Sequence, residues 1–136
     1  MKNNSLSNRV VKSFKLIDKN GAVIDTITIY VEIENIATMF NARLQILTEA
    51  ERELRRAQKT KNTIEFDKSA EKYAVATKAF IELIFGDENT SKLFDFYDNR
   101  YIDMAKAIAP FIKKELLPAI NNYKKAKKVE LKNQFK

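Results

Sequence analysis

Residues 10–33 read VVKSFKLIDKNGAVIDTITIYVEI, and this stretch decides how the chain begins to fold. Asn20-Gly21 is the strongest short signal for a β-hairpin, because both positions tolerate positive φ. The return half alternates two sets of residues, with Val23, Ile27, Ile29, Val31 and Ile33 on one face and Thr26, Thr28, Tyr30 and Glu32 on the other. A lone hairpin is marginally stable in water, so its apolar face should pack on helices or on a neighbouring subunit.

Two long helices are predicted next, over residues 34–59 and 64–85. Asn35 is the expected N-cap of the first, and Gly86 is placed to end the second in a left-handed conformation. The helical period appears in two stripes, Ile36, Phe40, Leu44, Leu47 and Leu54 in the first helix, and Phe66, Ala70, Tyr73, Thr77, Phe80 and Ile84 in the second.

Two more helices are predicted after Gly86. A short one covers residues 91–99, with Asn89, Thr90 or Ser91 as its cap and Asn99 at its end, and a long one covers 101–128. The long helix has an apolar stripe at Ile102, Ala105, Ile108, Ile112, Leu116 and Ile120, and a kink or break is expected at Pro110.

The predicted fold class is therefore mainly α with an N-terminal β-hairpin, a small domain of about four helices. We expect one domain over residues 11–123, with the hairpin at 11–33 and the helices at 35–123. Residues 1–10 and 124–136 are expected to be flexible ends.

The composition excludes several kinds of chemistry. The 136 residues include no cysteine and no histidine, which excludes disulfides, the common zinc sites and imidazole-dependent triads. We expect no catalytic residue, no cofactor and no metal ligand. The sequence shows neither a secretory signal nor an apolar run of about 20 residues, so a cytoplasmic protein without a membrane partner is expected.

The net charge of +7 is concentrated at the two ends of the chain. After Tyr123 there are six lysines and one glutamate, and the first fifteen residues hold four basic side chains and no acid, which leaves a net charge of −2 between them. A nucleic-acid-binding domain usually has a basic face on its folded body. The lysine-rich end could contact nucleic acid or an anionic membrane, but it lacks an apolar face with aromatic anchors other than Phe135, so a solvated terminus is the preferred interpretation.

The segment LIFGDENTSKLFDFYDNRYIDM, residues 83–104, holds the other candidate groups. Asp87 and Glu88 could belong to a metal loop, but acids favoured at a helix N-terminus are the ordinary explanation. The aromatic residues could stack bases, could be buried on both sides of a short helix, or could form an apolar patch that meets another protein. The predicted partner-binding residues are Thr28 and Tyr30 on the hairpin and Phe94, Phe96, Tyr97 and Tyr101 in this segment.

The order of these features resembles tail assembly chaperones of long-tailed bacteriophages. The resemblance lies in the Asn-Gly hairpin, the turn at Gly86, Asp87, Asn89 and Thr90, the segment Phe96–Asn99, and the helix with Pro110 and Pro118. It covers most of residues 11–122, and its motifs are apolar and helical.

The resemblance implies a non-enzymatic protein that coats the tape measure protein and keeps it soluble during tail assembly. It also implies a host-cytoplasmic location, absence from the finished virion, and in many relatives a frameshifted form that recruits the major tail tube protein. Homo-oligomers are expected on a separate ground: residues 26–31 of the return strand carry no charge and no proline, so their edge could pair with another copy. Two alternatives remain open: a small basic protein associated with nucleic acid, and a structural subunit of a phage particle.

Overall fold

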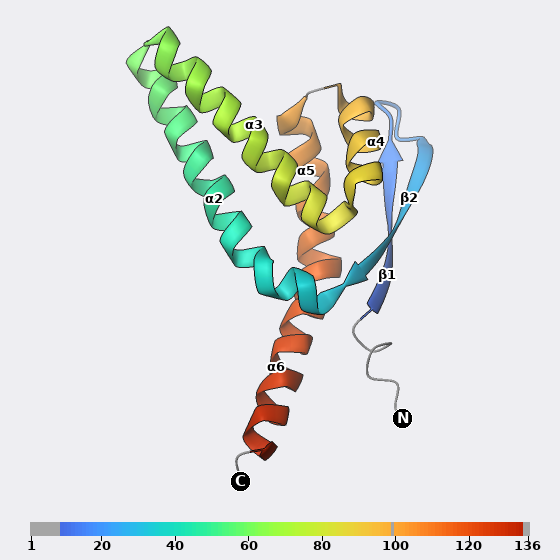
Figure 1. Ribbon diagram of the computed structural model, residues 1–136. Coiled ribbons are helices and arrows are strands. Elements are labelled where there is room, and N and C mark those ends of the chain that lie inside the picture. Colours follow the sequence, from blue (N-terminus) through green and yellow to red (C-terminus); the bar gives the residue numbers. More distant parts are fainter. Residues whose placement is uncertain (1–8, 99, 135–136) are drawn as a thin grey trace.

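The computed structural model describes residues 9–98 and 100–134, and it confirms the predicted fold class (Figure 1). An antiparallel hairpin of β1 (Arg9–Ile17) and β2 (Val23–Glu32) is followed by helices α2 (Ile33–Thr60), α3 (Thr63–Phe85), α4 (Asp87–Tyr97), α5 (Tyr101–Phe111), the π-helix η1 (Ile112–Leu116) and α6 (Leu117–Gln134).

The turn of the hairpin lies at Asn20-Gly21, as predicted, and the side chain of Asp18, which the prediction did not include, stabilises it. Asp18 Oδ1 accepts hydrogen bonds from the backbone N–H groups of Asn20 and Ala22, and Gly21 adopts φ 84°. The strand register shifts between Leu16 and Ile17, so the alternation changes near the turn. The prediction that Val23 faces the core was therefore wrong, because its side chain is 51% exposed.

Three helix termini differ from the prediction. α2 begins at Ile33, so Asn35 lies inside the first turn and is not the N-cap. α4 begins at Asp87, immediately after Gly86 with φ 82°, and this places Asn89, Thr90 and Ser91 inside the helix. Asn99 lies outside the described residues, and Asp98 in the left-handed region ends α4.

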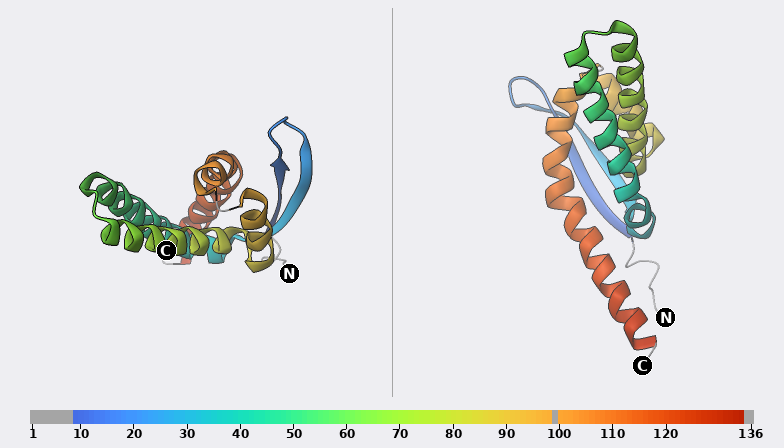
Figure 2. Two further views of the ribbon diagram at one scale, coloured as in Figure 1. Left: turned by 90° about the horizontal axis from the view of Figure 1, so that it is seen from above. Right: turned by 90° about the vertical axis from the view of Figure 1, so that its left-hand side faces the viewer.

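The last three helical segments form one continuous rod (Figure 2). Pro110 lies inside α5, and the rod then passes through one π turn, where the N–H of Leu117 donates to the carbonyl of Ile112. Pro110 therefore does not break the helix, and the irregularity is a widened π turn that begins two residues after it, at Ile112. α6 is helical as far as Gln134, well beyond residue 123, where we expected the domain to end.

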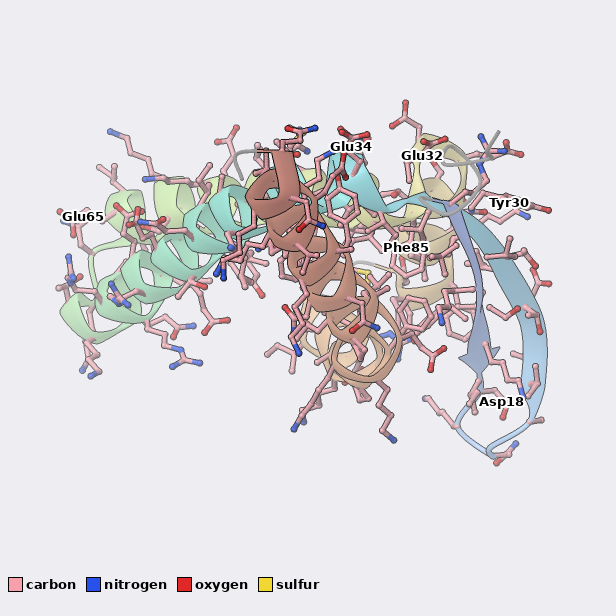
Figure 3. All side chains as sticks on the ribbon, turned by 90° about the horizontal axis from the view of Figure 1, so that it is seen from below. Asp18, Tyr30, Glu32, Glu34, Glu65 and Phe85 are labelled. Carbon is pink, nitrogen blue, oxygen red and sulfur yellow. The ribbon has the colours of Figure 1, made fainter. Side chains whose placement is uncertain are left out.

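The rod lies between the two other layers of the molecule. Figure 2 shows the α2–α3 helical hairpin on one side of α5 and the β-hairpin on the other, with α4 beside the β-hairpin. Phe14 on β1 joins the layers, because its ring meets Phe85 at 5.6 Å and Phe111 at 5.4 Å between centroids, both edge-on. Phe85 points into this space between the helices and the strands (Figure 3).

Candidate partner-binding groove

An apolar groove of about 530 Å³ lies between the α2–α3 helical hairpin and the rod. Most of its lining is aliphatic or aromatic, and its polar lining residues are Asn41, Glu51, Tyr73, Thr77 and Lys113. The remaining lining comes from three sides: Phe40, Leu44 and Leu47 of α2, Phe80 and Ile81 of α3, and Met104, Ala105, Ile108, Ala109, Ile112 and Leu117 of the rod.

The groove stays open because α2 and α3 are fixed to each other away from α5. Arg43 Nη1 donates to the carbonyl of Ala79 at 2.8 Å, and Lys72 Nζ lies 2.7 Å from Glu53 Oε2, so two polar contacts join α2 to α3. α2 also packs against α6 below the groove. The helical hairpin therefore diverges from α5 toward the top of Figure 1.

A second hollow of about 470 Å³ extends the apolar surface toward the N-terminus of α5. Tyr73 lines both hollows, and its ring meets that of Tyr101 edge-on at 6.2 Å. Ile102 contributes a side chain that is 69% exposed. From Ile102 to Leu117 the rod rises about 23 Å at about 1.5 Å per residue, the length of a helix of about four turns.

The aromatic residues predicted to bind a partner are divided between the core and this surface. Tyr97 is 7% exposed and belongs to the core, which leaves it little surface for a partner. Phe94 and Phe96 are half-buried, and Phe94 packs edge-on against Tyr101 at 5.8 Å. Of the four, Tyr101 is the one that lines the second hollow.

The two predicted hairpin residues lie on the far side of the molecule from the groove. Thr28 and Tyr30 are exposed on the outer face, and Tyr30 points away from the helices (Figure 3). Tyr30 pairs with Val11 across the strands, and both side chains are more than half exposed. Asn89 Nδ2 approaches the carbonyl of Thr28 at 3.5 Å, so α4 lies beside part of the β2 edge.

The acidic residues after Gly86 lie where the helix-terminus interpretation puts them. Asp87 and Glu88 are in the first turn of α4, where the helix dipole stabilises negatively charged side chains. Within residues 9–98 and 100–134, no cluster of three or more acidic side chains has the arrangement of a metal site.

Burial raises the pKa of the Tyr97 hydroxyl above 10.0, and the nearby Arg100 guanidinium partly offsets that effect.

The sequence prediction missed the groove, although a signal was present. The predicted stripe of the last helix faces both the core and the groove. Leu116 and Ile120 are buried away from the groove, Ala105 and Ile112 line it, and Ile108 is buried at its floor. Met104 and Phe111, outside that stripe, are also buried. The apolar arc of the rod is thus wider than the core needs, and its surplus faces the groove.

Comparisons of the chain with models of protein families, with curated proteins and with solved structures found no match. Over the described ranges, no helix combines the length and the apolar character that crossing a membrane requires.

Proposed function

We propose that this protein is a non-enzymatic tail assembly chaperone, which holds helical segments of the tape measure protein in its apolar groove. The observation that carries the proposal is an apolar, open groove with helices on its walls, which together with the second hollow extends over about 23 Å. Grooves of this kind bind the apolar face of an amphipathic helix, whose anchors recur at i, i+3, i+4 and i+7. The resemblance described above supplies the identity of the client.

The distribution of polar groups in the groove also supports a helical client. Glu51 is already paired with Arg55 at 2.9 Å, and Asn41 lies near the lower end. A helix satisfies its own backbone hydrogen bonds, so it can enter an apolar groove with few polar partners. An extended strand would bury N–H and C=O groups against side chains that cannot bond to them.

The client test is co-expression with a tape measure protein, the long reading frame expected beside the gene for such a chaperone. Leu44→Glu puts a charge on the wall of the groove, whereas Ile46→Glu puts the same charge on an exposed site of the same helix outside it. We expect the tape measure protein to be soluble with the parent chain and with Ile46→Glu, and to precipitate with Leu44→Glu.

The two variants separate binding from folding. Leu44 is 39% exposed and Ile46 is 55% exposed, so both should keep the melting temperature of the parent chain. A tape measure protein that remains equally soluble with Leu44→Glu would exclude the groove as the client site. One that is insoluble even with the parent chain would exclude the chaperone function.

The proposal includes self-association in the host cytoplasm and absence from the finished virion. The outer face of the hairpin is the surface that we assign to contacts between copies, because Val11 and Tyr30 expose apolar area there. Neighbouring copies would raise the effective concentration of grooves along one long client. A frameshifted form that recruits the tail tube protein belongs to the same proposal.

A further inference from the structure

The second half of α6 projects from the body as an arm, residues 124–134 (Figure 1). Every residue of the arm is exposed. Most of the stability of a protein helix comes from tertiary packing, and the arm has little of it, so contact with a partner would stabilise the arm.

The arm continues the groove along the same face of the rod. Leu117 lines the lower end of the groove, and Lys124 and Lys128 follow it by seven and eleven residues. At about 100° per residue both fall within about 20° of the direction of Leu117, and Leu131 falls within about 40°. An occupant that leaves the lower end of the groove along α6 therefore meets lysines and exposed apolar side chains.

The charge of this face is positive and largely unpaired. The arm holds five lysines and one glutamate, and Lys127 lies 3.8 Å from Glu130. Among the described residues, no acidic side chain lies within ion-pair distance of the remaining four, Lys124, Lys125, Lys128 and Lys132. The same holds for Lys113, the lysine that lines the groove. The lower end is thus basic, whereas charges near the upper end are paired, as in Arg100 with Asp103 at 3.3 Å.

We propose that the arm is the second half of the client site, and that it binds acidic residues following the C-terminal end of the helix held in the groove. This rests on the proposed function of the groove. The negative end of the helix dipole favours lysines, so the bound helix runs parallel to α5, with its C-terminus toward Lys113. Acidic side chains beyond that end then lie along Lys124 and Lys128.

The test uses three labelled peptides built on one amphipathic core of about 16 residues, which matches the length of the groove. The first is the core alone, and the other two carry a run of glutamates at the C-terminal or the N-terminal end. Affinity is measured by fluorescence anisotropy at about 0.05 M and about 0.5 M salt, because the higher concentration shortens the range of charge interactions to a few ångströms.

At low salt the peptide with C-terminal glutamates should bind about tenfold more tightly than the core, as about three exposed ion pairs would provide. Glutamates at the C-terminus weaken a free helix and those at the N-terminus strengthen it, so helicity alone predicts the opposite order. High salt and Lys124→Glu/Lys128→Glu should remove the gain. The control Lys68→Glu/Lys78→Glu makes the same charge change on exposed sites of α3 and should retain it.

Equal affinity for the three peptides, or preference for N-terminal glutamates, would overturn the role of the arm. The groove function would survive that result if the core peptide still bound and Leu44→Glu abolished its binding. Failure of every peptide to bind would overturn both proposals. Tight binding of a single-stranded oligonucleotide that requires Lys124 and Lys128, without peptide discrimination, would assign the arm to nucleic acid instead.

Discussion

Replacing Phe14 by alanine should destabilise the protein by about 3–5 kcal/mol, because this ring joins the β-hairpin to the helices. Phe14 is 5% exposed, and its ring makes two edge-on contacts, with Phe85 and with Phe111. Each aromatic pair adds about 0.5–1.5 kcal/mol to the burial of apolar area, which places the expected loss toward the upper part of that range. The melting temperature should fall by about 10–15 °C.

Urea and thermal unfolding followed by circular dichroism at the helical minimum measure this loss. Val11→Ala is the matched control, because Val11 lies on the same strand but on the outer face and is 56% exposed. It should change the free energy of unfolding by at most about 0.5 kcal/mol. A loss below about 1 kcal/mol for Phe14→Ala would mean that the hairpin is not docked on the helical core, and would refute the layered arrangement.

Two further predictions concern the hairpin and α4. Ile29→Lys should unfold the protein, because Ile29 is 2% exposed. Thr28→Lys, on the outer face, should leave the monomer folded and lower the sedimentation coefficient of the protein at high concentration. A sedimentation coefficient that Thr28→Lys does not change would exclude assembly through this face. The pKa of Tyr97 is raised in the folded protein, so the unfolded chain loses the hydroxyl proton at a lower pH than the folded chain does. The resulting stability is fully present below about pH 10 and is lost as the pH rises through the pKa of the folded state. Melting temperatures across this range should fall more steeply for the parent chain than for Tyr97→Phe, and identical slopes would contradict the burial effect.

Local patterns predicted the elements of this fold because their causes are local. The alternation of Ile27, Ile29 and Val31 correctly gave the buried face of β2, and these side chains are 1–2% exposed. Asn20-Gly21 correctly placed the turn. The prediction that Val23 is buried was wrong, because the strand register shifts beside it. That shift depends on how β1 pairs with β2, which the sequence of a single strand does not encode.

The wide apolar arc of the rod was a signal of surplus apolar surface, but the opening of the groove could not be predicted from it, because that opening depends on the angle between the helices. Leu44 and Leu47 have the periodicity of core residues, yet they line a space that opens because contacts such as that of Arg43 with Ala79 hold α2 on α3. Periodicity gives the direction of a side chain on its own helix and not the distance to the next helix. Tyr97 was predicted on a partner surface, and its burial likewise depends on packing between helices that the pattern of its own helix does not encode.

The π turn gives the rod a tolerance to the deletion of one residue that a plain α-helix lacks. Phe111 and Leu116 are five residues apart, the spacing of the hydrogen bonds in a π-helix, and both are buried. In an α-helix the position one turn after Phe111 would be Glu115, a carboxylate that instead pairs with Lys12 at 3.3 Å near the surface. The segment thus holds one residue more than an α-helical turn requires. A chain that lacks Lys114, which is exposed and lines no part of the groove, should close this turn as α-helix and keep both the groove and the arm in phase.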